Sequence, residues 1–175
     1  MSPPPPDYPT SLRVAIVCPA PAGSRLGNRI TAERWRRLLE ELGHDAFVIG
    51  DGDDPACDVL VALHARRSAQ AVASSREHHA ARPIVVALTG TDLYGDLATD
   101  ASAQRSLELA DRLVVLHDLA IDDLPAELRS KARVIRQSAE APSPVTRASD
   151  VFEVALVAHA RAEKDPLRAP LAARA

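Results

Sequence analysis

Hydrophobic residues gather in six short, almost continuous runs along the chain, and polar stretches with a helical period separate these runs. The runs span residues 13–18, 45–49, 59–64, 84–88, 112–116 and 133–137. Unbroken runs rich in valine, isoleucine and leucine are typical of β-strands that are covered on both faces. The pattern therefore predicts six buried strands.

The clearest helical stretch follows the first run. Its apolar residues recur every three to four positions, which predicts an amphipathic helix with one buried face. The residues on this face are Ile30, Trp35, Leu38, Leu39 and Leu42. Asn28 is the candidate N-terminal cap of this helix, and Gly43 is its candidate stop signal. Further helices are predicted over residues 68–80, 102–110 and 125–131.

Strands that alternate with helices over short connections predict an α/β fold, a Rossmann-like doubly wound parallel sheet with helices on both faces. In the usual strand order of such sheets, 3-2-1-4-5-6, the first and fourth strands are neighbours where the order reverses. Ligands bind at that point, beyond the carboxyl ends of the strands. We therefore expect the loop after Cys18 to face residues 89–94 across one crevice.

Composition shifts divide the chain into segments. They are a proline-rich extended tail at 1–10, the Rossmann-like domain at 11–140, a polar linker at 141–150 and a further segment at 151–175. The last segment contains a seventh apolar run at 152–157 and a helical stretch at 165–175. One strand and one helix cannot bury a core by themselves. We therefore expect this segment to be the truncated start of a second Rossmann domain.

Composition and charge argue against several classes of protein. Hydrophobic residues make up 46% of the chain and charged residues 26%, which suffices for a buried core. The formal net charge of −3 provides no strong positive field, so we expect no nucleic-acid partner. No signal-peptide pattern and no apolar run of about 20 residues is present, so we expect a soluble, cytoplasmic protein with no membrane partner. Cys18 and Cys57 have no metal-ligand spacing, and no metal or cofactor is predicted.

The loop after the first strand carries the first candidate site. Gly27, Asn28 and Arg29 stand where the first helix begins, and a helix N-terminus binds phosphate through its free N–H groups. The loop lacks the G-x-G-x-x-G pattern, which disfavours a dinucleotide ligand. The alternative is a surface loop with incidental arginines.

Polar residues also follow the third and fourth strands. His64 and Arg66 come directly after the third strand, where a histidine can orient a ligand and an arginine can hold an anion. The segment after the fourth strand brings hydroxyl and carboxylate groups to the same edge of the sheet. Its residues are Thr89, Gly90, Thr91 and Asp92. The alternatives are a helix cap at Thr91 or Asp92, and a histidine that only caps a neighbouring carbonyl.

Several longer motifs carry a resemblance to a known family. They are GNRITAERWRRLLEELGH, DVLVALHARRSA, RPIVVALTGTDLYGDL, SLELADRLVVLH and EKDPLRAP. In these motifs the chain resembles the selenosugar synthases of selenoneine biosynthesis, which are similar to retaining glycosyltransferases with two facing Rossmann domains (the GT-B fold). The resemblance implies transfer of a sugar from a UDP-sugar, such as UDP-N-acetylglucosamine, to selenophosphate without a cofactor. It also implies that this chain corresponds to the amino-terminal, acceptor-side half.

The resemblance assigns roles to the candidate residues. It places Asp92, Thr91 and His64 at the reaction centre, with His64 orienting the substrate rather than abstracting a proton. The residues that it places against the substrates are Gly27, Asn28, Arg29, Arg66, Thr89 and Gly90. Lys164, after the seventh run, matches the lysine of the basic pair that grips the donor diphosphate and neutralises the leaving group, and Arg161 or His159 is its candidate companion.

Two other functions stay open at this point. The first is an ordinary retaining glycosyltransferase with an oxygen acceptor, because the motif TGTDLY does not choose selenium over oxygen. The second is a non-catalytic domain that binds a phosphate-bearing small molecule or another chain. With most of the donor site missing, we expect residues 1–175 alone to lack catalysis.

Overall fold

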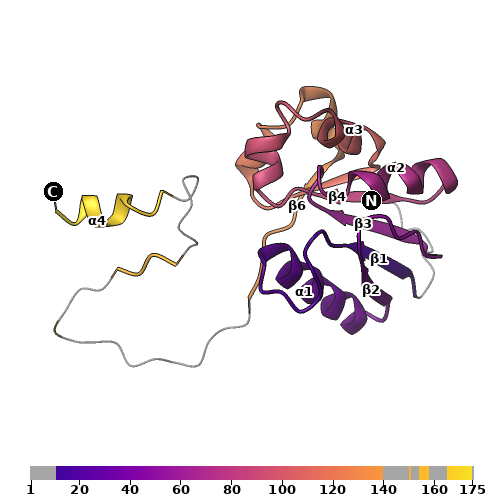
Figure 1. Ribbon diagram of the computed structural model, residues 1–175, viewed down its shortest axis with the longest axis horizontal. Coiled ribbons are helices and arrows are strands. Elements are labelled where there is room, and N and C mark those ends of the chain that lie inside the picture. Colours follow the sequence, from indigo (N-terminus) through magenta and orange to yellow (C-terminus); the bar gives the residue numbers. More distant parts are fainter. Residues whose placement is uncertain (1–10, 140–149, 151–153, 158–164, 175) are drawn as a thin grey trace, which may run out of the picture. The chain divides into compact units, whose positions relative to one another are not determined.

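The computed structural model describes residues 11–139, 150, 154–157 and 165–174, and it divides into two units, Met1–Ser138 and Ala139–Ala175. The first unit contains a six-stranded, all-parallel sheet in the order β2-β1-β3-β4-β5-β6 (Figure 1). The strands are β1 (Arg13–Val17), β2 (Asp45–Ile49), β3 (Val59–Leu63), β4 (Ile84–Ala87), β5 (Arg112–Val115) and β6 (Ala132–Val134). The predicted α/β, Rossmann-like doubly wound fold is confirmed.

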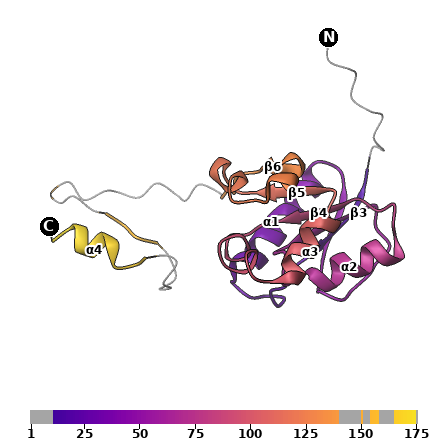
Figure 2. The same cartoon turned by 90° about the horizontal axis from the view of Figure 1, so that it is seen from above.

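Helices cover both faces of the sheet. The α-helices described in this unit are α1 (Gly27–Glu41), α2 (Ala69–His78) and α3 (Ala101–Leu109). Alternate residues of each strand point to opposite faces, so Val14 and Ile16 pack with Ala32 of α1, while the intervening residues pack with α2 and α3. Figure 2 shows α2 and α3 side by side, as does Figure 1. Burial on both faces explains why the strands read as continuous apolar runs.

The expected strand order is wrong in one respect. Strand β3 lies between β1 and β4, with Ala15 paired to Leu60 and Val61 paired to Val85. The order therefore reverses between β1 and β3, and the loop after β1 is the neighbour of the loop after β3 rather than of residues 89–94. Both orders bury equally apolar strands, so the hydrophobic pattern does not distinguish them.

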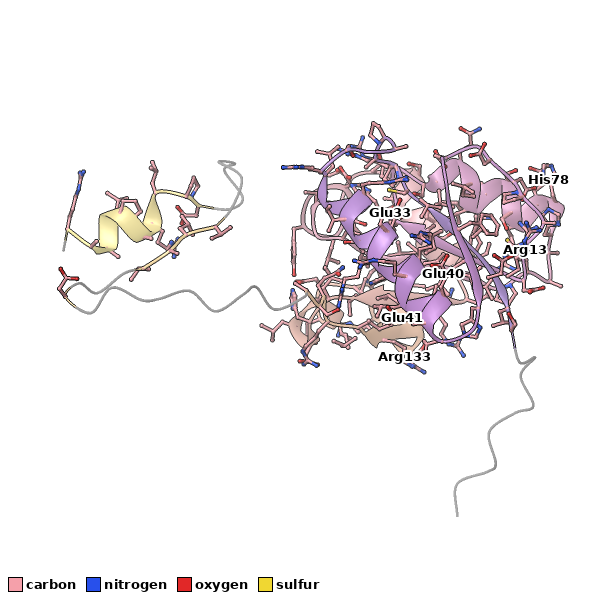
Figure 3. The ribbon with its side chains drawn as sticks, turned by 90° about the horizontal axis from the view of Figure 1, so that it is seen from below. Arg13, Glu33, Glu40, Glu41, His78 and Arg133 are labelled. Atoms are coloured by element: carbon pink, nitrogen blue, oxygen red, sulfur yellow. The ribbon has the colours of Figure 1, made fainter. Side chains whose placement is uncertain are left out.

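Helix α1 begins one residue earlier than its predicted cap. Leu26 occupies the N-cap position with extended backbone angles and no side-chain cap, so the prediction of Asn28 as the cap is wrong. The backbone N–H groups of Arg29 and Ile30 both bond to the carbonyl of Leu26. Figure 3 looks onto the charged side of α1, along which Glu33 and Glu40 lie.

The predicted stop at Gly43 is confirmed. Gly43 has a φ of +90°, and its N–H donates a hydrogen bond to the carbonyl of Glu40. The N–H of His44 donates a hydrogen bond to the carbonyl of Leu39. This pair of hydrogen bonds is the Schellman motif, in which a glycine in the left-handed region satisfies the last carbonyls of a helix.

Replacing Gly43 with alanine is expected to lower the free energy of unfolding by about 1–2 kcal/mol, because an L side chain is strained at this φ. No atom lies within 4 Å of the added methyl group, so the loss comes from the backbone alone. Gly27→Ala is the matched control, since its methyl group also meets open space and its φ is not positive. Urea unfolding of both variants checks this, and equal stabilities would contradict it.

The last two predicted strands differ most from the structure. Strand β6 ends at Val134, and beyond it Gln137 and Ser138 contact Thr31 and Arg34 of α1 instead of continuing the sheet. The described part of the predicted seventh strand, residues 154–157, has no strand structure, because a strand needs a hydrogen-bonded neighbour. The short helix α4 (Arg168–Ala172) lies within the predicted helical stretch.

In the part of the chain that the structure describes, no helix is long and apolar enough to cross a membrane.

Candidate functional site

A cleft of about 850 Å³ opens at the carboxyl ends of β1, β2 and β3, at the point where the strand order reverses. It is lined by residues 18–22 after β1, residues 48–51 and Asp53 around the end of β2, Arg66 and Arg67 after β3, and Arg29 of α1. Parallel sheets of this kind bind their ligands at this position. The cleft is therefore the candidate functional site.

Three guanidinium groups place positive charge in the cleft. Arg29 is mostly buried and forms an ion pair with Glu33 of 2.6 Å, and the Arg66 Nε atom lies 2.9 Å from an oxygen of Asp96. Arg67 is exposed and has no carboxylate partner among the described residues. Its positive charge is thus free to meet an anion in the cleft.

Two carboxylates also line the cleft, and both are bonded to backbone. Asp51 accepts a hydrogen bond of 2.9 Å from the N–H of Ala71, and Asp53 accepts one of 2.9 Å from the N–H of Gly50. These bonds hold the loop after β2 and the start of α2 in place. The acidic groups therefore shape the cleft wall, while the arginines supply its anion-binding groups.

His64 ends β3 with an unusual backbone. Its φ is +75°, a region that non-glycine residues seldom adopt, and its side chain is fully buried. The Nδ1 atom accepts a hydrogen bond of 3.4 Å from the N–H of Arg67, so the neutral ring carries its proton on Nε2. Nε2 lies 3.2 Å from the hydroxyl of Thr91. His64 therefore connects the loop after β3, including Arg67, with the loop after β4.

Asp92 is 0% exposed and accepts three backbone hydrogen bonds. They come from the N–H groups of Ala65 (2.9 Å), Thr89 (2.9 Å) and Gly90 (3.0 Å), and Gly90 adopts a φ of +110°. The carboxylate thus fixes the loops after β3 and β4 to each other, and the N–H groups of Thr89 and Gly90 point inward. These bonds come from N–H groups before Asp92 in the chain, and Thr91 occupies the N-cap position of the following turn without a side-chain cap bond, so they are not the helix cap of the alternative interpretation. A catalytic role for Asp92 stays a prediction.

The other predicted site residues fall into three groups. Arg29 and Arg66 line the cleft, whereas Thr91 contacts His64, and neither of these two belongs to the cleft lining. Gly27 and Asn28 begin α1 but do not belong to the cleft lining. The remaining two, Arg161 and Lys164, lie outside the described residues.

Two residues that contribute to the site were not predicted from the sequence. Arg67 follows Arg66 in the motif HARRS, and this doubling is the signal that could have identified it. Asp96 approaches Arg66 because the segment Asp92–Asp96 forms a π-helical turn, with the N–H of Leu97 bonded to the carbonyl of Asp92. No local sequence pattern predicts this π-helical turn.

Burial lowers the pKa of His64 below its ordinary value of 6.5, because desolvation disfavours the imidazolium, and Asp92 and Asp96 offset this effect in part. Below about pH 6.5 the unfolded chain binds a proton at His64 that the folded protein does not bind. The contribution of His64 to the free energy of unfolding is therefore complete above about pH 6.5 and decreases as the pH falls below that value.

We expect His64→Asn, which tolerates a positive φ, to remove this contribution. Unfolding free energies measured between about pH 8 and about pH 5 should show a larger difference between wild type and variant at the higher pH. Parallel pH profiles would contradict the assignment.

No group of three or more histidine, cysteine, aspartate or glutamate side chains in the described ranges can hold a metal ion.

Comparison with known proteins adds no family to this picture. No protein-family model matches the chain, and no curated protein matches it.

Proposed function

We propose that this domain is the acceptor-binding half of a glycosyltransferase of the selenosugar synthase kind, which binds selenophosphate in the cleft and presents it to a UDP-sugar. One observation carries the proposal: Arg29, Arg66 and Arg67 line a cleft at the reversal point of a parallel sheet. Guanidinium groups bind phosphate oxygens with two parallel hydrogen bonds, which suits a small anion. The choice of selenophosphate and a UDP-sugar as the substrates rests on the resemblance in sequence motifs.

The environment of His64 fits a selenium nucleophile. Selenophosphate is already ionised, so attack of its selenium on the anomeric carbon requires no strong general base. The bond from that carbon to UDP breaks as the selenium–carbon bond forms, and water then cleaves the phosphorus–selenium bond to give the selenosugar and phosphate. His64 is buried, and its Nδ1 atom is already bonded to the N–H of Arg67. In the proposed function it positions Arg67 against the anion. An alcohol acceptor has no such charge and needs a base, so the oxygen-acceptor alternative is less well supported.

A non-catalytic role as a phosphate-binding domain is the second candidate. The burial of Asp92 favours this second candidate, because the carboxylate already accepts hydrogen bonds from three backbone N–H groups. Such a domain needs the arginine cleft but no reaction centre. The two candidates therefore share the anion site and differ in the chemistry that follows binding.

Calorimetric titration of the full chain with selenophosphate, inorganic phosphate and a neutral sugar alcohol tests the shared part. We expect the two anions to bind and the sugar alcohol to give no heat, while the reverse would overturn the proposal. UDP-N-acetylglucosamine is then added and the mixture is analysed by mass spectrometry. A selenosugar product supports the transferase and excludes the second candidate. Since residues 1–175 alone are expected to lack catalysis, anion binding without product is the expected result for both candidates.

A further inference from the structure

Two exposed rings meet at the carboxyl edge of the sheet, away from the arginine cleft. Tyr94 belongs to the turn after β4, and His117 follows β5, the neighbouring strand. Tyr94 is 60% exposed, in a chain in which aromatic residues make up 3% of the total. Neither ring contributes to the hydrophobic core. Their exposure at the ligand-binding edge therefore calls for an explanation other than packing.

The two rings form one flat surface. The Tyr94 hydroxyl lies 2.8 Å from Nε2 of His117, the ring centroids are 6.4 Å apart, and the ring planes differ by 9°. The hydroxyl projects from the outer end of the tyrosine ring, so a hydrogen bond through it at this centroid separation places the rings end to end. The planes are nearly parallel, so the rings present adjacent faces to the same side. We call this pair the Tyr94–His117 plate.

The backbone holds the plate in place. The Tyr94 N–H bonds to the carbonyl of Gly90 at 3.0 Å, and the adjacent Leu93 is buried in the core. The His117 carbonyl accepts a bond of 3.2 Å from the N–H of Ala120, in the short helix Asp118–Ile121. A surface that is ordered before binding loses little conformational entropy when a ligand stacks on it.

The polar atoms of the plate remain suited to a ligand. Partial burial and the nearby Asp123 raise the pKa of Tyr94, so its phenol keeps its proton at neutral pH. The Nδ1 atom of His117 has no hydrogen-bond partner among the described residues. The plate therefore combines an apolar face with hydrogen-bonding atoms at its edge, which is the combination that ring-shaped polar ligands require.

We propose that the Tyr94–His117 plate is a second subsite, which stacks the flat face of a ring in the substrate, either the apolar face of a sugar or a nucleobase. The inference deepens the proposed function and rests on it for the phosphate-bearing end of the ligand. His64 and Thr91 lie in the loops between the two subsites along the sheet edge, because β3 separates β1 from β4. Stacking on aromatic rings tolerates both kinds of ring, since each offers a flat face.

Proton NMR of two neutral probes, uridine and N-acetylglucosamine, tests the plate without relying on the arginines. With the full chain, we expect ring-current shifts of the protons of at least one probe, and Tyr94→Ala should weaken its binding about tenfold or more. His117→Ala should also weaken binding, and Tyr94→Phe should retain more affinity than Tyr94→Ala. Tyr8→Ala, at the other tyrosine of the chain, is the matched control. The probe that responds identifies the ring.

Inorganic phosphate, titrated into the same proteins, separates this inference from the proposed function. Phosphate affinity should be unchanged by Tyr94→Ala. If phosphate binds and the binding of neither probe depends on Tyr94, the proposed stacking subsite is overturned while the proposed function stands. If a probe depends on Tyr94 and phosphate does not bind, the plate stands and the proposed function fails. Thermal unfolding of the Tyr94 variants, expected to match wild type because the ring is exposed, excludes misfolding as the cause.

Discussion

Asp92→Ala is expected to lower the free energy of unfolding by about 3–5 kcal/mol, the largest effect of any substitution considered for this site. The carboxylate is 0% exposed and accepts hydrogen bonds from Ala65, Thr89 and Gly90. Alanine leaves these N–H groups without their acceptor in a region that excludes water, and each unsatisfied buried group is costly. Urea unfolding followed by circular dichroism measures the loss.

Asp53→Ala provides the comparison for this result. Asp53 is exposed and accepts one backbone hydrogen bond, from Gly50, so its loss is expected to stay near 1 kcal/mol. Asp92→Asn should fall between wild type and Asp92→Ala, because one amide oxygen still accepts while the amide nitrogen cannot. An Asp92→Ala protein as stable as Asp53→Ala would show that the carboxylate does not tie the two loops together.

Arg67→Glu should weaken the binding of selenophosphate at least about 30-fold, or about 2 kcal/mol. Arg67 lines the cleft and has no carboxylate partner among the described residues, so its charge is available to the ligand. Glutamate replaces an attractive charge with a repulsive one at the same place. Isothermal calorimetry measures the change, which should shrink as salt is raised because the cleft is open to solvent.

Arg112→Glu makes the same change in net charge elsewhere. Arg112 is exposed at the start of β5, so it lies at the amino-terminal edge of the parallel sheet, opposite the cleft. We expect it to change the affinity less than twofold, since charges separated by more than about 10 Å are screened at 0.1 M salt. Equal losses in the two variants would mean that net charge, and not the cleft, governs anion binding.

The sheet was predictable because strands that are buried on both faces leave a plain signal. All six apolar runs became strands, and Gly43 ended α1 as its φ of +90° requires. The strand order was not predictable, since burial is the same whether β3 or β4 lies beside β1. The seventh apolar run predicted a strand, but its described residues, 154–157, form none, because an apolar pattern favours a strand even where the described residues provide no neighbouring strand.

The carboxyl edge of the sheet was predictable as the place of the candidate site, but the loops that meet there were not. The loop after β1 meets the loop after β3 at the cleft and not the expected residues 89–94, and Arg29 and Arg66 line it. The inward turn of the Asp92 carboxylate depends on the positions of three N–H groups in two loops, which a linear pattern does not contain. The same holds for the pairing of Tyr94 with His117, which requires β4 and β5 to be neighbours.

An amide chemical-shift map of the full chain during titration with selenophosphate tests whether the cleft binds the anion. We expect the largest shifts at amides that line the cleft. These amides are Cys18, Ala20, Gly50, Asp51, Arg66 and Arg67. Shifts that saturate at these positions, and that Arg67→Glu abolishes, would establish the cleft as the anion site. No shifts, or shifts concentrated at the opposite edge of the sheet around Asp58 and Arg112, would show that the cleft does not bind the anion.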